Sequence, residues 1–478
     1  MAGHIRNGCG EPKSLHSAVY TFGFDNTLKY MRAYRENRSC EFAESLHQEL
    51  GNTFRLPSAK GNGVQTCDPK NVQALLATQF HDFDLGGRRE AYKPLLGDAI
   101  FASDGKTWEH NRALLRPNFV RNQIADIEVF EKHVLQLLKH IPRDGSTVDL
   151  QEVFLRMTVD LATEFLFGES IGTLNSGSLD TNNEFPKNFK TSLAGLLIRT
   201  LLGSLRVFHG IGNTKFKNAI AETRNYVRKI VKRALEQRER RLSGQAEKSE
   251  SPGQNYVFLY ELVNHVQDED VLIGQLLSML IAGRDTTAIL LSMTFITLSR
   301  REDVWSKLRA EVLTLEGRKP SFEDLKSMKY LTWVMNETLR LYPVVPLNIR
   351  TATVNTTLPR GGGPNGDLPI FIAKGSDIQW STYAMHRLPE IYGEDAAEFR
   401  PERWEDLRPG LAYIPFHAGP RICIGQQFAL TEAGYSIVRL LQEFESIESR
   451  DPEPILKRVG LTLSSANGAK VALTPVQA

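Results

Sequence analysis

The sequence has few cysteines, and they do not stand in pairs. Only Cys9, Cys40, Cys67 and Cys423 occur among 478 residues, with no CxxC motif and no cysteine–histidine spacing typical of a metal site. This scarcity argues against a disulfide framework and against a structural zinc site. It fits a protein of a reducing compartment.

Long uncharged apolar segments are also missing. A membrane-spanning helix needs about 18 or more such residues. The longest comparable run, 271–283, contains Gln275 and Ser278 and ends at Arg284 and Asp285. Because the first 52 residues are polar and charged throughout, we expect no signal peptide. Either the natural form has no membrane anchor or an anchor has been removed.

An excess of one charge is absent as well. Lys and Arg total 58 and Asp and Glu total 56, so no global field marks the chain as a nucleic-acid binder. With 41% hydrophobic residues, the chain can bury a large core and a bulky cofactor. We expect a single domain over residues 1–478.

The most informative stretch surrounds Cys423. It reads FHAGPRICIG from Phe416 to Gly425 and precedes a helix-like run, 426–444. A thiol at a helix N-terminus lies near positive dipole charge, which favours the thiolate, a good soft ligand for iron. Gly419 permits a tight turn and a close approach of the backbone to a flat ligand. A lone cysteine is more often an ordinary buried residue, but the whole pattern F-x-x-G-x-R-x-C-x-G is far more specific.

This pattern resembles the haem-binding loop of the cytochrome P450 family, in which the cysteine thiolate is the axial ligand of haem iron. The resemblance implies haem b with Cys423 as the metal ligand and Arg421 as a haem propionate partner. It also places Phe416 and Gly419 in the loop that carries the cofactor.

Three further arginine and aromatic positions match the family. Trp108 and Arg112 lie at i and i+4, so they share one helix face and can donate to the same anionic group. Without other evidence, such a pair more often consists of a Trp packed on the core and an Arg whose side chain extends past it. The resemblance assigns Trp108 and Arg112 to one haem propionate and Arg350 to the second.

A long helix is predicted from the acidic cluster 268–270 to about residue 299. Midway it carries AGRDTT, residues 282–287, although Gly, Thr and Asp all disfavour a helix interior. A helix kink with Thr bonded back to a carbonyl is one explanation. The resemblance gives another: Gly283 opens space for O2, Thr286 hydrogen-bonds the iron-bound peroxide and Asp285 feeds protons inward.

Two other motifs receive structural interpretations. Glu337 and Arg340 on an expected helix, 321–342, together with Arg403, resemble the family's Glu-Arg-Arg triad that holds the cysteine loop. The glycines Gly361, Gly363 and Gly366 spell GxGxxG, but a strand-like segment follows them rather than a helix, so we predict a hairpin turn and no dinucleotide site.

The expected fold class is mainly α with a small β region, the cytochrome P450 fold, with haem between the long central helix and the cysteine loop. Helices should dominate about 100–340 and 381–450, including one amphipathic helix from 124 to about 170. Strands should occupy about 50–70, 345–380 and 455–475, and a helix should open at Asp68, an N-cap followed by Pro69 in the first turn. The aromatic residues near 20–24 and 28–34 should pack onto the body, the apolar run 193–208 should be core or surface, and 240–254 should be a solvated linker.

The resemblance implies a monooxygenase that inserts one oxygen atom from O2 into a C–H bond of an apolar substrate. Because no flavin or NAD site is present in the sequence, electrons should come from NADPH-cytochrome P450 reductase. Residues 416–433 look especially like the fungal alkane and fatty-acid hydroxylases, which implies terminal or near-terminal hydroxylation of a long-chain fatty acid or alkane. The expected location is the cytosolic face of the endoplasmic reticulum membrane if an anchor was removed, with peripheral membrane contact, and otherwise the cytoplasm.

Three alternatives remain open. A haem-thiolate enzyme that rearranges peroxides or dehydrates would share Cys423, but typically lacks the pair Asp285 and Thr286. A hydroxylase of aromatic or xenobiotic compounds would share every motif. A non-enzymatic haem sensor or carrier would show the same spectrum without NADPH-dependent product.

Overall fold

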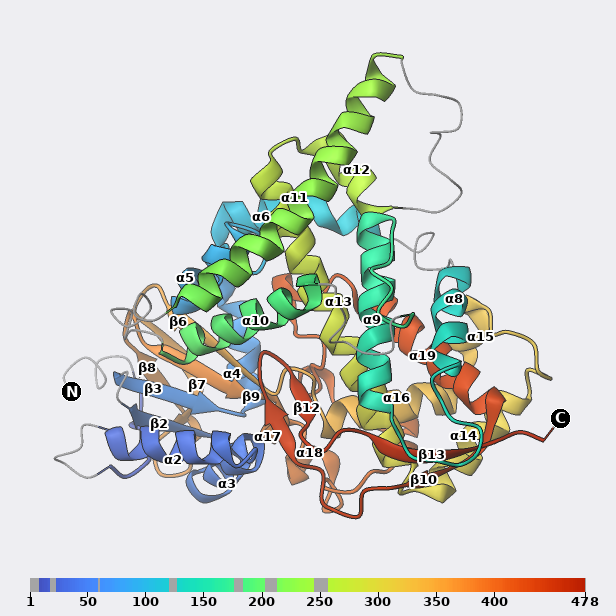
Figure 1. Cartoon of the computed structure of the whole chain (residues 1–478). Coiled ribbons are helices and arrows are strands. Elements are labelled where there is room, and N and C mark those ends of the chain that lie inside the picture. Colours follow the sequence, from blue (N-terminus) through green and yellow to red (C-terminus); the bar gives the residue numbers. More distant parts are fainter. Residues whose placement is uncertain are drawn as a thin grey trace. The chain divides into compact units, whose positions relative to one another are not determined.

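A computed structural model gives the fold of the chain, and it describes residues 8–17, 23–58, 61–119, 127–175, 184–202, 213–244 and 257–477. The chain forms two compact units, whose helices and strands are labelled in Figure 1. Unit 1 comprises Met1–Gly86, Thr332–Cys423 and Glu453–Asn467, and unit 2 comprises Gly87–Leu331, Ile424–Pro452 and Gly468–Ala478.

Unit 1 is built on a mixed sheet with the strand order β1-β2-β3-β9-β6-β4. The strands are β1 (Lys13–Ser14), β2 (Thr53–Ser58), β3 (Gly61–Thr66), β4 (Phe83–Asp84), β6 (Leu347–Ala352) and β9 (Asp377–Ser381). The parallel pairing of β3 with β9 joins the N-terminal third of the chain to its C-terminal third. Alternating burial along β9 places Ile378 and Trp380 in an apolar core, as expected for a strand that buries one face.

Smaller elements complete unit 1. The hairpins are β7 (Thr356–Gly362) with β8 (Leu368–Ile372), and β11 (Lys457–Val459) with β12 (Leu463–Ser465). The helices are α2 (Phe24–Arg35), α3 (Ser39–Leu50), α4 (Pro69–Gln73), α17 (Thr382–Met385), α18 (Pro389–Tyr392) and, from Thr332 onward, α16 (Lys329–Leu341). The short helical turns are η1 (Ala74–Thr78), η2 (Phe80–Asp82), η6 (Pro401–Glu405), η7 (Gly410–Ala412) and η8 (Gly419–Arg421).

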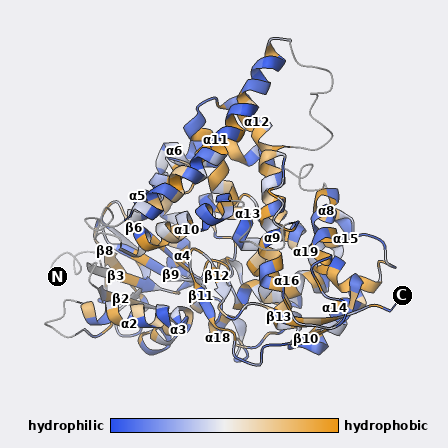
Figure 2. Cartoon of the chain, in the orientation of Figure 1, coloured by the Kyte–Doolittle hydropathy of each residue, from blue (hydrophilic) through white to orange (hydrophobic). Residues whose placement is uncertain are grey.

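Unit 2 is mostly helical. Its helices are α5 (Gly87–Leu96), α6 (Gly105–Leu115), α8 (Ile127–Leu138), α9 (Leu150–Phe167), α10 (Glu184–Leu202), α11 (Thr214–Leu242), α12 (Phe258–His265), α13 (Glu269–Leu298), α14 (Glu302–Leu313), α15 (Phe322–Ser327) and α19 (Gln426–Glu443). A short turn, η3 (Arg116–Phe119), follows α6, and a three-stranded sheet joins β10 (Phe444–Ser449), β13 (Lys470–Pro475) and β5 (Val148–Asp149). Figure 2 shows hydrophobic residues along α9 and α13.

Helix α13 is the central element of unit 2. Asp268 caps its N-terminus by accepting hydrogen bonds from the backbone amides of Asp270 and Val271. Among the described residues it is the one helix long and apolar enough to cross a membrane, but 67% of its most apolar window is buried inside the protein. Because a core helix passes the same test of length and composition, this finding is weak evidence for a membrane span.

Several sequence predictions are confirmed. The long helix, the cap at Asp68 before Pro69, the strands in residues 51–67 and 346–380, and the hairpin turn at Gly361–Gly366 all appear where we expected them. The fold class, mainly α with a small β region, is also confirmed.

Two predicted helices are wrong because each is interrupted. The helix expected over 124–170 is two helices, α8 and α9, because Pro142 and Gly145 break the chain between them. The helix expected over 321–342 is α15 and α16, because Met328 takes an extended backbone conformation between them. Residues 124–126 lie outside the described residues.

The linker expected at 240–254 begins later than predicted, since α11 continues to Leu242, and residues 245–254 lie outside the described residues. In the apolar run 193–208, Leu193 and Leu196 are buried, whereas Ile198 is exposed. Its last residues, 203–208, also lie outside the described residues.

The packing expected for residues 28–34 is wrong in part. Tyr30 does pack against Phe42, but Leu28, Met31 and Tyr34 are exposed. Phe24, in the segment 20–24 that was also expected to pack, is exposed as well. Residues 20–22 are not described.

Candidate functional site

The cysteine loop of unit 1 is held by its own backbone. The amide of Cys423 donates to the Phe416 carbonyl oxygen at 3.0 Å, and the amide of Ile422 donates to the Gly419 carbonyl oxygen at 3.0 Å. Gly419 has φ +64°, and a Cβ at this position would strike the Leu76 carbonyl oxygen. The loop therefore needs glycine at position 419 for both its conformation and its packing on η1.

Cys423 differs from the other cysteines in exposure. Cys40 and Cys67 are buried, and burial raises the pKa of the Cys40 thiol to about 12 and that of Cys67 well above its usual range. Cys423 is exposed on its loop, three residues before α19 begins at Gln426. Only an accessible sulfur can bind an external metal centre, so Cys423, and not Cys40 or Cys67, has the suitable setting; Cys9 is half-exposed.

Arg350 is buried beside the same loop. Its Nη2 donates to Nε2 of His417 at 3.2 Å, its Nη1 donates to the Ile349 carbonyl oxygen at 2.8 Å, and its guanidinium lies over the Trp380 ring at 5.3 Å. Because Nε2 of His417 accepts, Nδ1 carries the proton and donates to the Ala418 carbonyl oxygen at 3.1 Å. His417 thus links Arg350 on β6 to the cysteine loop.

Sequence reasoning gave His417 no role in the site and missed this contact. The residue has φ +67°, which a non-glycine residue adopts rarely. No sequence signal marks that conformation, so the contact could be found only in three dimensions. Arg421, also in the loop, lies over the Phe80 ring at 6.0 Å.

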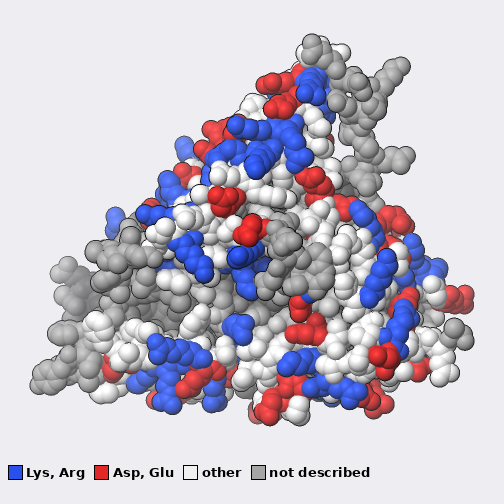
Figure 3. Space-filling model, viewed as in Figure 1, with Lys and Arg blue, Asp and Glu red and all other residues white. Residues whose placement is uncertain are grey.

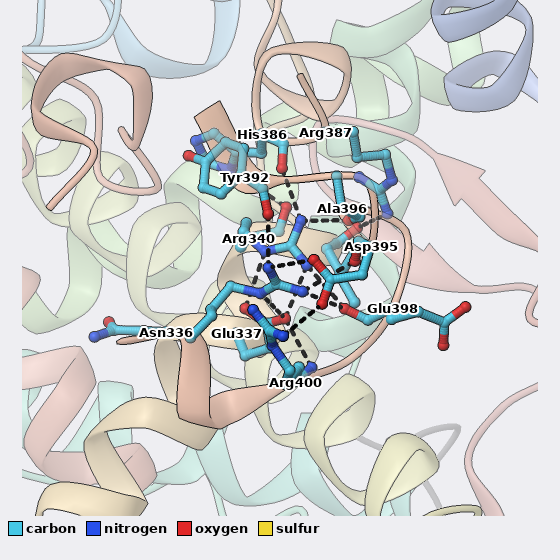
Figure 4. A network of polar contacts seen from close by, with 12 residues as sticks. Asn336, Glu337, Arg340, His386, Arg387, Tyr392, Asp395, Ala396, Glu398 and Arg400 are labelled. Carbon is cyan, nitrogen blue, oxygen red and sulfur yellow. Dashed lines mark hydrogen bonds and ion pairs between the residues drawn. The ribbon is translucent and has the colours of Figure 1, made fainter. Parts of the chain in front are cut away.

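The Glu-Arg-Arg triad predicted from sequence is confirmed. Glu337 and Arg340 are completely buried and joined at 2.8 Å, and Nε of Arg403 donates to the same carboxylate at 2.8 Å. Figure 4 shows the guanidinium of Arg340 meeting backbone carbonyl groups as well, namely those of His386, Ala396 and Glu398. These extra hydrogen bonds offset the cost of burying three charges.

Two residues connect this network to the segment that leads into the cysteine loop. His386 bridges the Arg340 carbonyl oxygen, at 3.3 Å from Nδ1, and the Ile414 amide, at 3.0 Å from Nε2. Tyr413 donates to the Asn336 carbonyl oxygen at 3.1 Å. The geometry therefore suits a supporting role for the triad.

In unit 2, the middle of α13 has a local change in burial. Residues 281–286 are half-exposed, whereas the helix is buried over 272–280 and 287–298. Thr286 donates from Oγ1 to the Ala282 carbonyl oxygen at 2.6 Å, and the helix continues without a break. A Cβ atom added to Gly283 would lie 3.6 Å from its nearest neighbour, the Cβ atom of Ala162. This is an ordinary contact distance, so close packing does not require glycine at position 283.

Asp285 is paired with its neighbour on the same helix. Its Oδ1 lies 3.0 Å from Nη1 of Arg284, whose guanidinium lies over the Phe189 ring at 5.9 Å. The Arg284 carbonyl oxygen accepts from Thr158 on α9 at 2.5 Å. The carboxylate is thus held by a charged group at the half-exposed part of α13.

Trp108 and Arg112 lie on α6 of unit 2, as the i, i+4 spacing predicted. Trp108 is buried, and the Arg112 guanidinium lies over its ring at 6.0 Å. This contact fits either interpretation of the pair that the sequence allowed.

A buried carboxyl group on α19 was not found by sequence reasoning. Glu432 is 2% exposed, its Oε1 has no hydrogen-bond partner, and burial raises its pKa to about 8. Thr287 of α13 interacts with the other side of the same carboxyl group. No periodic sequence signal distinguishes such a group from a solvent-facing glutamate of a helix.

The predicted site residues therefore fall into two groups. Unit 1 holds Phe416, Gly419, Arg421 and Cys423 in one loop and brings Arg350 to it through His417. Unit 2 holds Gly283, Asp285 and Thr286 on α13, with Trp108 and Arg112 on α6.

The residues of the loop fit haem. A glycine whose Cβ would meet the η1 backbone, an exposed thiol and a buried arginine suit a flat, anionic, iron-containing ligand. Such a loop on a mainly helical fold defines a protein of the haem-thiolate class.

Comparison with known proteins supplies the family. The Cytochrome P450 family model matches residues 26–471. The chain is 43% identical over 474 residues to Cytochrome P450 monooxygenase himC of Aspergillus japonicus, covering 98% of this chain and 84% of that protein. It is 43% identical to Cytochrome P450 52A13 of Debaryomyces hansenii, with 95% and 90% covered, and 45% identical to Cytochrome P450 52A3-B of Candida maltosa, with 97% and 91% covered.

The chain belongs to the cytochrome P450 family. It is a haem-dependent monooxygenase, an oxidoreductase whose iron is held by a cysteine thiolate. Membership implies O2, an apolar substrate and an external reductase as electron donor.

Proposed function

We propose that this monooxygenase hydroxylates a long-chain fatty acid or alkane at or near its terminal carbon. The observation that carries the proposal is the likeness of residues 416–433 to the fungal alkane and fatty-acid hydroxylases, together with 43–45% identity to the 52A relatives over nearly the whole chain.

In this proposal Cys423 is the thiolate ligand of haem b. Arg421, Arg350 and Arg112 would neutralise the haem propionates, which are costly to bury alone, and Trp108 would donate a hydrogen bond to one of them. Phe416, Gly419 and Gly283 shape the space for the cofactor and O2. The bound haem supplies O2 activation, helped by electron donation from the sulfur.

Asp285 and Thr286 deliver protons. Thr286 donates its hydroxyl proton to the Ala282 carbonyl oxygen, so it must rotate its side chain to donate toward a ligand. Asp285, half-exposed and held by Arg284, would take up a proton from the solvent and pass it on as the replacement. The donor of electrons is NADPH-cytochrome P450 reductase, and the enzyme works at the cytosolic face of the endoplasmic reticulum membrane.

The direct test is reconstitution with that reductase, NADPH and a panel of fatty acids, alkanes and aromatic compounds. We expect a substrate-induced spectral shift and terminal or near-terminal alcohols from the aliphatic compounds. Turnover of the aromatic compounds alone would reject the aliphatic substrate. Haem binding without any NADPH-dependent product would reject the enzymatic function.

Replacing Thr286 tests the proton route. We expect Thr286→Ala to lower the rate of product formation by about 100-fold, since a positioned proton donor contributes at least that much to the rate. The product formed per NADPH consumed should fall with it. Thr297→Ala is the matched control, because Thr297 makes the same back-bond, to the Met293 carbonyl oxygen, at a buried position of the same helix. Tight coupling in Thr286→Ala would show that the assignment is wrong.

A further inference from the structure

Helix α11 of unit 2 is rich in basic residues, and those in its middle are paired. Figure 3 shows blue Lys and Arg groups along this helix, in the upper part of the view. Arg224 and Arg228 lie 2.6 and 3.1 Å from Oδ1 of Asp270 on α13. Arg233 lies 2.7 Å from Oε1 of Glu169. These arginines therefore serve to join α11 to its neighbours within the unit.

The last turn of α11 is different. Arg240 is exposed, Arg238 and Arg241 are half-exposed, and among the described residues none of the three has an ion-pair partner. Three arginines and one glutamate give residues 238–244 a net charge of +2. The guanidinium groups of this turn are thus available to an anionic partner from outside the chain.

Ser243 follows this turn directly. It is exposed, and its hydroxyl group donates to the Arg240 carbonyl oxygen at 3.1 Å on the surface of the protein. On one side of it, Leu242 is 72% exposed. On the other side, Gly244 is exposed and has φ +70°, so the chain leaves the helix there. The hydroxyl group and both neighbouring residues are therefore accessible to another protein.

The order of residues at this end has a known chemical use. Arg240 and Arg241 stand three and two positions before Ser243. Basophilic protein kinases select serines with this spacing, because carboxylates in their substrate groove pair with both guanidinium groups. Such a groove takes an extended segment, so the last turn of α11 has to open. Helix ends open at little cost, and among the described residues no ion pair holds this one closed.

The same spacing occurs once more in the sequence, in a different environment. Ser321 follows Arg318 and Lys319, but its hydroxyl group caps α15 by donating to the Asp324 carboxylate and accepting from the Asp324 amide. Asp324 also pairs with Arg318, and Lys319 lies 3.5 Å from Oε1 of Glu131. The hydroxyl group and both basic residues are already engaged. The structure therefore distinguishes two serines that the sequence pattern does not.

We propose that Ser243 is phosphorylated by a basophilic serine/threonine protein kinase. Oγ of Ser243 forms a bond to the γ-phosphorus of MgATP, the bond from that phosphorus to the β–γ bridging oxygen breaks, and ADP leaves. The hydroxyl proton passes to the catalytic aspartate of the kinase. The phosphate adds up to about two negative charges, which brings residues 238–244 from a net charge of +2 to about zero. The modification does not depend on the substrate of the hydroxylase or on turnover.

Phosphorylation of the haem-loaded full chain by cyclic-AMP-dependent protein kinase and MgATP tests the proposal. Mass spectrometry of the digested protein locates and quantifies the phosphate. We expect Ser243 to carry at least about tenfold more phosphate than Ser321 at early times, since Ser321 must first lose hydrogen bonds to a charged group. Ser243→Ala should lower the total phosphate at least about tenfold, whereas Ser321→Ala should leave it within about twofold.

Two double variants test the role of the arginines. Arg240→Gln with Arg241→Gln should lower kcat/KM for phosphorylation of Ser243 at least about tenfold, because two charge-assisted contacts with the kinase are lost. The control is Lys229→Gln with Lys232→Gln, at exposed lysines earlier on the same helix, which should stay within about twofold. Glutamine is a good helix former, so α11 itself should persist in both.

Three results would overturn the proposal. One is the absence of phosphate from Ser243, and another is as much phosphate on Ser321 as on Ser243. The third is an equal loss of kcat/KM in the two double variants. The reduced carbon monoxide spectrum shows whether each variant is folded, and Arg240→Gln alone replaces the arginine double variant if that one is not. Because labelling requires neither reductase nor substrate, its failure leaves the hydroxylase proposal to its own test.

Discussion

The Glu337 carboxylate accepts more hydrogen bonds than the carboxylate of an ordinary ion pair does. Its carboxylate accepts from Nε and Nη2 of Arg340, Nε of Arg403, the Arg400 amide and Nε1 of Trp404. Because both arginines are buried with it, removing the carboxylate leaves two positive charges without their main partner.

We therefore expect Glu337→Ala to lower the free energy of unfolding by about 3–5 kcal/mol. Urea unfolding followed by circular dichroism measures the loss, and haem content should fall with it. Glu169→Ala removes the exposed pair with Arg233 and should cost about 1 kcal/mol or less. Equal effects of the two substitutions would contradict the importance of burial.

Glu432 predicts a stability that depends on pH. Its pKa in the folded state is about 8, whereas an unfolded glutamate titrates at about 4.3. As pH rises through this window, the unfolded state releases its proton first, so the folded state loses stability relative to it. Above about pH 8 both states are ionised and the loss is complete.

Glu432→Gln removes this ionisation. We expect the variant to be near the unchanged protein in stability at about pH 5 and to gain a few kcal/mol over it by about pH 8. Urea titrations across this range give the difference. A difference that does not change with pH would mean that the carboxyl group is ionised in the folded protein.

At the scale of single elements, α13 contains two glycines with opposite environments. A Cβ on Gly274 would strike the Leu96 carbonyl oxygen, whereas a Cβ on Gly283 meets only Ala162 at an ordinary contact distance. Alanine favours a helix interior over glycine by about 1 kcal/mol. The two glycines should therefore respond to the same substitution with different signs.

We expect Gly274→Ala to destabilise unit 2 by about 1–3 kcal/mol through overpacking, and Gly283→Ala to stabilise it by up to about 1 kcal/mol. Thermal unfolding of both variants gives the signs. If Gly283→Ala is more stable yet loses turnover, the glycine serves function rather than packing. Full turnover in that variant would remove Gly283 from the site.

The cysteine loop offers a second pair of glycines. Gly419→Ala must adopt φ +64° against the Leu76 carbonyl oxygen, which should cost at least about 2 kcal/mol and most of the bound haem. Gly425 has φ −91°, which alanine can adopt, and a Cβ atom added there would meet only the Phe119 ring, at 3.7 Å. The Gly425→Ala variant should therefore retain haem. Haem absorbance per protein measures both. A haem-loaded Gly419→Ala would show that the close approach to η1 is dispensable.

Sequence reasoning succeeded where one residue pattern determines one local structure. Asp68 before Pro69, Asp268 before α13 and the turn at Gly361–Gly366 each follow from backbone chemistry within a few residues. It failed for Met328, since a methionine is compatible with a helix and only tertiary packing makes it extended. It missed His417 and Glu432 because their partners are Arg350 and Thr287, which are distant in sequence.

At the scale of the whole molecule, two buried histidines limit stability in acid. Burial lowers the pKa of His47 to about 4 and that of His386 to about 3, against about 6.5 in an unfolded chain. The unfolded state therefore binds protons first as pH falls. The contribution of each neutral histidine is complete above about pH 6.5 and is lost as pH falls toward about 4 and 3 respectively.

We expect His47→Phe to resist acid better than the unchanged protein, since His47 packs edge-on against Phe54 and its Nε2 has no hydrogen-bond partner. His386→Phe should instead lose stability at neutral pH, because it leaves the Ile414 amide unpaired. Acid-induced loss of far-ultraviolet circular dichroism separates the two variants. The same acid midpoint for the two variants would contradict the different roles assigned to His47 and His386.

The parallel pairing of β3 with β9 has a consequence for biosynthesis. Gln65 and Gln379, which face each other in that pair, lie 314 residues apart. A ribosome needs on the order of tens of seconds to make the intervening chain. Until β9 has been synthesised, the edge of β3 in the β2–β3 hairpin therefore remains unpaired. Nascent chains should depend on chaperones until the last third of the chain leaves the ribosome.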